Sequence, residues 1–94
     1  MSTTKMWAAC RGKFIVGAFP SKAQTEKNIL SAKETLTCVA GTFVESRTGG
    51  LFAVSLHGKL FAAYADRRRA KMYVEVFSGC EDRKIVRGNF REDK

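Results

Sequence analysis

Three consecutive arginines, Arg67, Arg68 and Arg69, are the residues of this sequence with the clearest chemical potential. Lys71 follows two positions later, and Asp66 directly precedes the run. Guanidinium groups stay charged and donate paired hydrogen bonds to phosphate oxygens, so a run of this kind is suited to the backbone of a nucleic acid. A charged surface loop that resists aggregation has the same composition, and that alternative stays open.

Two tyrosines accompany the arginine run. If the segments on either side of the arginines are paired strands, Tyr64 lies opposite Lys71 and Tyr73 lies opposite Ala62 on one face of the sheet. Aromatic rings beside cations on an exposed sheet face hold the bases of single-stranded nucleic acids by stacking. The alternative is that a helix covers this face, because the alanines on it leave room for one.

A second concentration of positive charge lies near the amino terminus. Residues 1–20 contain Lys5, Arg11 and Lys13 and no acid. Over the whole chain, 17 lysines and arginines outnumber 9 acids, which gives a net charge of +8. Such an excess favours polyanions, acidic protein surfaces or anionic membranes as partners. No apolar segment approaches the length that spans a bilayer. Among these partners we expect nucleic acid or an acidic protein surface, and no membrane.

Catalytic and metal-binding motifs are not recognisable in this sequence. His57 is the only histidine, and we expect it in a turn, so a Ser-His or Cys-His nucleophile would lack the second, orienting group of a recognisable motif. The cysteines and His57 include no chelating pair such as C-x-x-C, so we expect no metal and no cofactor. Gly49 and Gly50 lack the lysine and helix that complete a phosphate-binding loop. A small phosphodiester-cleaving enzyme that uses only Arg, Lys and Tyr remains the one enzymatic alternative.

The cysteines indicate the compartment. Cys10, Cys38 and Cys80 are odd in number and widely spaced, which is typical of free thiols in a reducing environment. The amino-terminal residues include no apolar segment long enough for a secretory signal. We therefore expect a cytoplasmic protein.

A hairpin is the first of the elements that position these residues. Two apolar runs, LFAVSL and KLFAAYA, are separated by His57 and Gly58. A two-residue loop of this kind favours a type I′ turn, since glycine adopts positive φ freely and histidine tolerates it. In an unbroken ladder, Val54 then lies opposite Phe61.

A third strand over residues 70–76 is predicted to return beside the second, after a loop at 66–69. This register gathers several apolar residues on one face, which we take as core because a one-residue slip would scatter them. They are Phe52, Val54, Phe61, Met72, Val74 and Val76. The alternative is a helix over 59–73, since Ala, Leu, Lys and Arg favour one.

The remaining segments predict further strands and a single helix. The strands cover 5–10, 13–19, 38–45 and 84–90, and the helix covers 22–36. Pro20 ends the second strand because it has no N–H, and Ser21 with Gln24 has the spacing of a helix cap. The paired glycines at 49–50 are typical of a hairpin turn between the strands that flank them.

Together these elements predict one compact α+β domain over residues 1–94, with residues 91–94 frayed. We expect an antiparallel, strongly bent or barrel-like sheet of about six or seven strands, with one helix between the second and third strands. We find no internal repeat. The order of elements is compatible with small RNA-binding barrels, although none of the signature residues of those barrels is present.

On this basis we expect a non-catalytic protein that binds an anionic partner, with nucleic acid as the leading hypothesis. The residues predicted to contact it are Arg67, Arg68, Arg69, Lys71, Tyr64, Tyr73, Arg11 and Lys13. One alternative is a small inhibitor or adaptor that binds an acidic protein surface, for example a viral antagonist of host defence. Another is a binder of a phosphorylated small molecule or nucleotide. Whether the chain forms a homodimer is also open.

Overall fold

Antiparallel strand pairing closes the sheet of this protein into a barrel. The structure is a computed structural model that describes residues 3–77, 79 and 81–93. Within these residues the elements are, in order, β1 (Thr3–Arg11), β2 (Phe14–Phe19), α1 (Lys22–Ser31), β3 (Thr37–Glu45), β4 (Leu51–Leu56), β5 (Lys59–Tyr64), α2 (Arg67–Val76) and β6 (Arg83–Glu92). The strand order around the barrel is β1-β2-β5-β4-β6-β3. The α+β class, the barrel-like antiparallel sheet and the helix between the second and third strands are confirmed.

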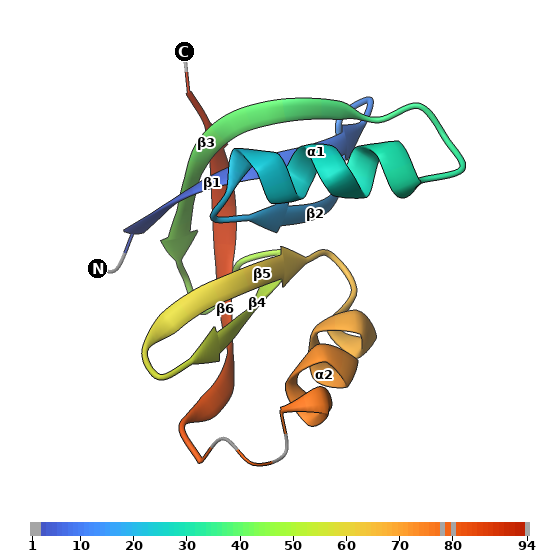
Figure 1. Ribbon diagram of the computed structural model, residues 1–94. Helices are drawn as coiled ribbons and strands as arrows, with labels where there is room; N and C mark the ends of the chain where they lie inside the picture. Colours follow the sequence, from blue (N-terminus) through green and yellow to red (C-terminus); the bar gives the residue numbers. More distant parts are fainter. Residues whose placement is uncertain (1–2, 78, 80, 94) are drawn as a thin grey trace.

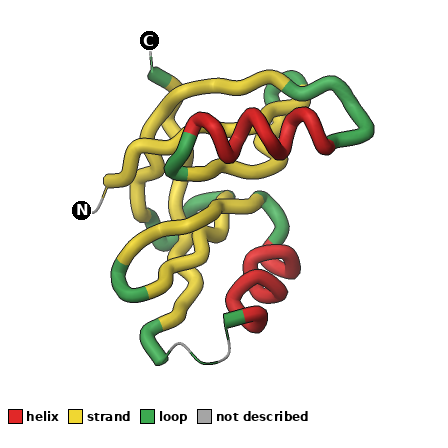
Figure 2. Tube along the Cα trace, in the orientation of Figure 1, coloured by secondary structure: helices red, strands yellow, loops and turns green. Residues whose placement is uncertain are grey.

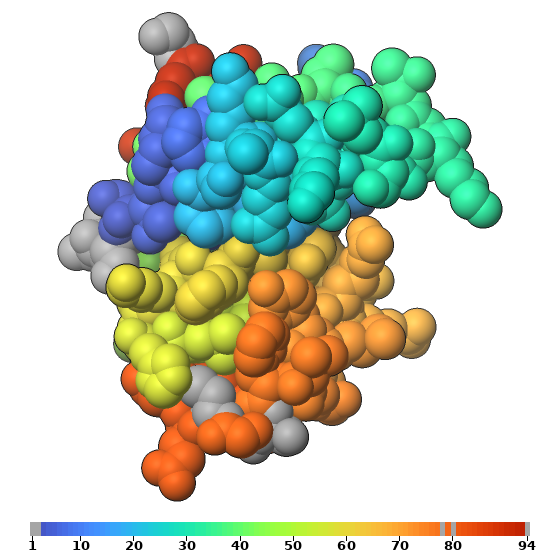
Figure 3. All heavy atoms as spheres, in the orientation of Figure 1, coloured from blue at the N-terminus to red at the C-terminus, as the bar shows by residue number. Residues whose placement is uncertain are grey.

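Figures 1 and 2 show both helices on the outside of the barrel, and the long strand β6 running through both halves of the view. α1 packs on β1, β2 and β3, whereas α2 packs on β4, β5 and β6. In the space-filling view of Figure 3, α1 lies at the upper surface and α2 at the lower surface of the molecule. β6 pairs with β4 along residues 83–88 and with β3 along residues 88–92. β6 therefore joins the two halves of the barrel.

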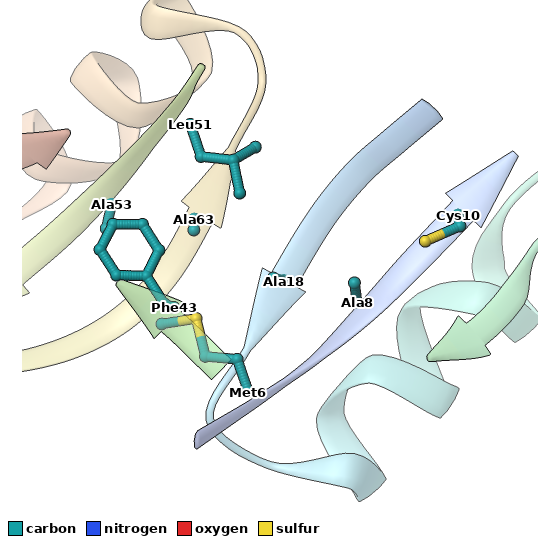
Figure 4. Packing of buried hydrophobic residues seen from close by; sticks show 8 residues of the cluster. All are labelled: Met6, Ala8, Cys10, Ala18, Phe43, Leu51, Ala53 and Ala63. Carbon is teal, nitrogen blue, oxygen red and sulfur yellow. The ribbon is translucent and has the colours of Figure 1, made fainter. Parts of the chain in front are cut away.

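The barrel interior is filled by buried apolar side chains from five strands, which Figure 4 shows pointing into one space. They are Met6, Ala8, Cys10, Ala18, Phe43, Leu51, Ala53 and Ala63. The alanines let the strands approach closely, and Phe43 and Met6, which are fully buried, fill the space between them. A second buried cluster, Val54, Leu56 and Ala70, lies between β4 and α2.

Local signals in the sequence account for two confirmed features. His57 and Gly58 have φ values of 53° and 78°, so the two-residue turn between β4 and β5 forms as predicted. The Ser21 hydroxyl accepts a hydrogen bond from the backbone N–H of Gln24 at 3.4 Å and caps α1. The helix ends at Ser31 rather than at residue 36.

The predicted third strand at 70–76 is wrong, because residues 67–76 form the helix α2. The carboxylate of Asp66 accepts a hydrogen bond from the backbone N–H of Arg68 at 2.9 Å and caps the helix. The helical alternative is therefore correct for this segment, although residues 59–64 remain a strand. Met72 and Val76 are 68% and 78% exposed, so their assignment to the core is also wrong.

The predicted register of the β4–β5 hairpin is wrong beyond the first pair. Leu56 pairs with Lys59, but the register shifts between Val54 and Ser55, and Val54 pairs with Ala62. This β-bulge adds one residue to one strand and turns Phe61 outward, where it is 39% exposed.

Two predictions about chain ends and neighbours are corrected by β6. The strands that flank Gly49 and Gly50 do not form a hairpin, since β6 lies between β3 and β4. Residues 91–92 belong to β6, and the backbone N–H of Asp93 donates to the carbonyl of Ala40 at 2.9 Å, so the tail is paired rather than frayed as far as the structure describes it. The Asp93 carboxylate also pairs with Lys5.

The prediction that there is no internal repeat is wrong, because the two halves of the barrel have the same arrangement of strand, strand, helix and strand. Trp7 pairs with Phe19 just as Phe52 pairs with Tyr64, each 45 positions further along. The bulge between residues 9 and 10 recurs between residues 54 and 55. The sequence hides the repeat because few of the equivalent residues are identical.

The helices and the last strand of each half continue this correspondence. Ser21 caps α1 and Asp66 caps α2, and Thr25 and Ala70 are the buried residues of the two helices. Ala18 pairs with its equivalent Ala63, and Phe43 pairs with its equivalent Phe90. A pseudo-twofold axis therefore passes through these two pairs on opposite sides of the barrel.

Replacing Gly88 by Ala is expected to destabilise the protein by about 3 kcal/mol, because a Cβ there would collide with the Phe43 ring and the Val44 carbonyl. Gly50→Ala is the matched control, since a Cβ at Gly50 meets nothing within 4 Å. Urea unfolding of the two variants measures the difference. Equal stability of the two variants would contradict the close approach of β3 and β6.

Candidate nucleic-acid interface

The first turn of α2 carries the arginine run that the sequence singled out. Arg67, Arg68 and Arg69 are all exposed, and Lys71 is exposed on the next turn. The Asp66 carboxylate accepts the capping hydrogen bond from the backbone, and it forms no ion pair with a described guanidinium group. Successive helical residues point about 100° apart, so these cations spread around the start of the helix rather than along one face. The free N–H groups of a helix start add to the positive potential.

The structure brings Tyr64 and Tyr73 together with Arg69, although through a helix rather than through a sheet. The ring centroids of Tyr64 and Tyr73 are 6.4 Å apart, and the Arg69 guanidinium carbon lies 5.6 Å from the Tyr64 centroid. Tyr64 pairs with Gly17 and Phe52 in the sheet. The predicted placement of Tyr64 opposite Lys71 is therefore wrong.

An aromatic row extends these contacts across the outside of the barrel. The Phe19 ring meets Tyr64 edge-on at 6.1 Å, and Tyr73 lies 5.4 Å from Phe77. Phe19 is buried, whereas Phe77 is 38% exposed. The row therefore packs α2 on the barrel at one end and reaches solvent at the other.

The Tyr64 ring packs against its neighbours and positions Arg69, so it is not free to stack on a base. A Cβ at Gly17 would lie 3.4 Å from the Tyr64 ring, so the ring rests on the β2 backbone, and Arg69 lies over it. Burial raises the pKa of Tyr64, the proximity of Tyr73 raises it further, and the Arg69 charge acts in the opposite direction. The tyrosine thus stays neutral and orients the guanidinium above it.

Arg11 and Lys13 lie apart from α2 in the chain, at the β1–β2 turn of the first half. Arg11 Nη1 donates to both carboxylate oxygens of Glu34, at 3.2 and 3.0 Å, and its guanidinium lies 5.5 Å from the Phe14 ring centroid. The charge of Arg11 is therefore balanced locally. Lys13 is exposed.

An open groove beside β6 is a basic surface that the sequence did not reveal. It has a volume of about 1180 Å³. Its lining residues are Val44, Glu45, Ser46, Arg47, Lys84, Ile85, Val86, Arg87, Asn89 and Arg91. We call it the β6 groove. Residues 38–58 and 72–94 each have no net charge, so counting charge along the chain could not find it.

The alternation of polar and apolar residues along β6 is the sequence signal from which this groove could have been predicted. Arg87, Asn89 and Arg91 alternate with Val86, Gly88 and Phe90, and a strand places such alternate residues on opposite faces. Val86 and Phe90 pack against the barrel interior. The polar set therefore faces outward.

The thiols and the described carboxylates offer no further site. Cys10 is buried and Cys38 is exposed, and both are free; Cys80 lies outside the described residues. Burial raises the pKa of Cys10, with smaller contributions from Glu92 and Cys38. Within the described ranges, no group of His, Cys, Asp and Glu side chains could hold a metal ion. None of the described helices has both the length and the apolar character needed to span a bilayer.

Comparisons with known proteins add nothing to these geometric observations. Neither the family models nor the curated proteins nor the solved structures that we compared with this chain match it. The functional argument therefore depends on the described residues.

Replacing Tyr64 by Phe is expected to make the protein less sensitive to alkaline pH. Because the pKa of Tyr64 is raised above 10.0 in the folded state, the unfolded chain loses this proton first, and stability falls as pH rises through that value. Phe keeps the ring under Arg69 but has no proton to lose. Urea unfolding of both proteins at pH about 8 and about 11 measures the difference. An equal loss of stability in both proteins would contradict this account of Tyr64.

Proposed function

We propose that this protein binds nucleic acid, without catalysis, through the first turn of α2. The observation that supports this most directly is that the cations there are exposed and lack ion pairs with the described carboxylates. Among the described residues, no carboxylate forms an ion pair with Arg67, Arg68 or Lys71. Exposed guanidinium groups without an internal partner are available to phosphate oxygens.

The fold itself does not require this charge. The α1 residues equivalent to Arg67, Arg68 and Arg69 are Lys22, Ala23 and Gln24, and Glu26 is equivalent to Lys71. α1 packs on its half of the barrel as α2 does, with a cap and one buried residue at the same positions. The additional cations of α2 are therefore suited to a partner rather than to packing.

Phosphate contacts by these cations would favour any nucleic-acid sequence about equally, since the phosphate backbone carries little sequence information. Arg69, held above Tyr64, is the cation with the best-defined position. Phe77, at the exposed end of the aromatic row, is a ring on which a base could stack. The proposal is thus a binder of moderate selectivity that depends strongly on salt.

The variant Arg67→Ala/Arg68→Ala/Arg69→Ala is expected to bind nucleic acid more weakly than the wild type, with a flatter salt dependence. Each lost phosphate contact removes about 0.7 from the log–log salt slope on single strands and about 0.9 on duplex DNA, so three contacts remove about 2 units or more. Fluorescence anisotropy with single-stranded RNA, single-stranded DNA and duplex DNA at several salt concentrations measures the slope.

The matched control removes the same charge from the first half, as Lys22→Ala/Lys27→Ala/Lys33→Ala. All three lysines are exposed, and this variant is expected to keep the wild-type slope. Equal effects of the two triple variants would remove α2 from the interface. If the wild type binds none of the three nucleic acids at low salt, the proposed function is wrong.

A second candidate function is binding to an acidic protein surface, as an inhibitor or adaptor. Met72 and Val76 are the observation that favours it, because they are one turn apart on α2 and are 68% and 78% exposed. A helix with cations at its start and apolar residues further along fits a partner that is acidic beside an apolar patch. Such a complex would survive nuclease treatment and be weakened by Met72→Ser/Val76→Ser, whereas nucleic-acid binding would not depend on that variant.

A further inference from the structure

We propose that the β6 groove is a second anion-binding site, which holds an extended chain of phosphate groups. The site does not share residues with the first turn of α2. It extends the proposed function, on which it rests for its preferred ligand, the phosphodiester backbone of a nucleic acid. The argument depends on the charges in the groove, on its length and on the way its wall is fixed.

The charges in the groove are mostly positive and mostly unpaired. Four cations, Arg47, Lys84, Arg87 and Arg91, line it against one described carboxylate, Glu45. The side chains of Arg47, Lys84 and Arg91 are exposed, and none of them has a hydrogen bond or an ion pair with a described residue. Cations that gather along an open groove raise the local concentration of anions.

The length of the groove indicates a ligand with several phosphates. Arg87 and Arg91, which share the outer face of β6, are four residues apart, which corresponds to about 13 Å at the rise of an extended chain. A single phosphate would reach one of these cations at a time. An extended polyphosphate or phosphodiester chain can contact Arg47 and Arg91 together, with Lys84 lining the far end of the groove.

The wall of the groove is fixed before a ligand arrives. Arg87 donates from Nε and Nη2 to the Gly49 carbonyl, at 3.1 and 2.9 Å, while its guanidinium lies 5.3 Å from the Phe52 ring centroid. The backbone N–H of Ser46 donates to the Arg87 carbonyl at 2.9 Å. These bonds hold both ends of the loop that carries Arg47, so little chain entropy is lost when Arg47 contacts an anion.

The other half of the barrel shows that the fold does not need these cations. The β3 residues equivalent to Arg87, Asn89 and Arg91 are Ala40, Thr42 and Val44, 47 positions earlier. β3 pairs with its neighbours in the same register as β6 does. The polar and basic residues on the outer face of β6 are therefore specific to the second half, as the arginines of α2 are.

The variant Arg47→Ala/Lys84→Ala/Arg91→Ala tests the site directly. We expect it to bind labelled oligo(dT) of about 20 nucleotides at least tenfold more weakly than the wild type, with a salt slope lower by about 2 units. The control Lys22→Ala/Lys27→Ala/Lys33→Ala removes the same charge and is expected to keep the slope. Combining the groove and α2 substitutions should multiply their effects if both surfaces contact one strand.

Two further measurements keep the test decisive. Asn89→Thr/Arg91→Val installs the residues that β3 carries at the equivalent positions, so it should fold even if the triple variant does not, and it should bind oligo(dT) more weakly than the wild type. Inorganic tripolyphosphate and a nucleoside triphosphate are tested in parallel, to determine whether the groove also binds small phosphorylated molecules. We expect tripolyphosphate to raise the Tm of the wild type and of the α2 variant, but not that of the groove variant.

The outcomes separate this site from the proposed function. The β6 groove is not an anion site if the groove variants bind oligo(dT) as the α1 control does and if tripolyphosphate shifts the Tm of the groove variant as much as that of the wild type. This holds even if the α2 variant loses binding. If the wild type binds no nucleic acid but tripolyphosphate stabilises it through the groove, the proposed function fails and the groove stands as a site for free phosphates.

Discussion

The close approach of β3 and β6 is the contact on which the rest of the structure depends. Gly41 lies against the Phe90 ring, and Gly88 lies against the Phe43 ring, so each glycine leaves the space that a ring from the other strand occupies. Any side chain at either glycine would push the strands apart. Without this contact β6 could not pair with both β3 and β4, and the two halves would have no common strand to close the barrel.

The internal symmetry of the barrel separates residues that serve the fold from residues that are free to serve a partner. Some equivalent buried positions carry the same residue, as Ala8 and Ala53 do and as Ala18 and Ala63 do. The two halves differ on the outside, where the second half carries the arginines of α2 and the cations of β6. The first half thus serves as an internal comparison for the second.

The sequence predicted the elements whose signals are local. The turn at His57 and Gly58, the cap at Ser21 and the position of α1 depend on a few adjacent residues, and all of them formed. The predicted third strand failed because residues 70–76 have apolar residues at alternate positions, which indicate a strand. The helix-forming residues of this segment and the Asp66 cap outweighed that pattern. A capping carboxylate directly before three good helix formers was the signal to weigh against that pattern.

The candidate site was predictable only in part, because part of it depends on contacts between residues that are far apart in the sequence. Charge counting along the chain finds clusters such as the arginine run, and these residues are exposed as expected. The β6 groove combines Arg47 with residues about forty positions away, because β6 is placed beside β3 by the closure of the barrel rather than by the chain. The bulge beside Val54 could not be predicted from the sequence either, since it depends on how two strands fit together and not on the composition of either strand.

The order of the two halves along the chain is not dictated by the barrel they build. Ser46 follows β3 and donates its backbone N–H to Arg87, and Asp93 follows β6 and donates in the same way to Ala40, the residue equivalent to Arg87. The ion pair between the Asp93 carboxylate and Lys5 links the carboxyl-terminal end of β6 to β1. A circularly permuted chain, closed between these ends and opened in the loop between Ser46 and Gly50, would therefore retain every strand pair, cap and buried contact of the present one.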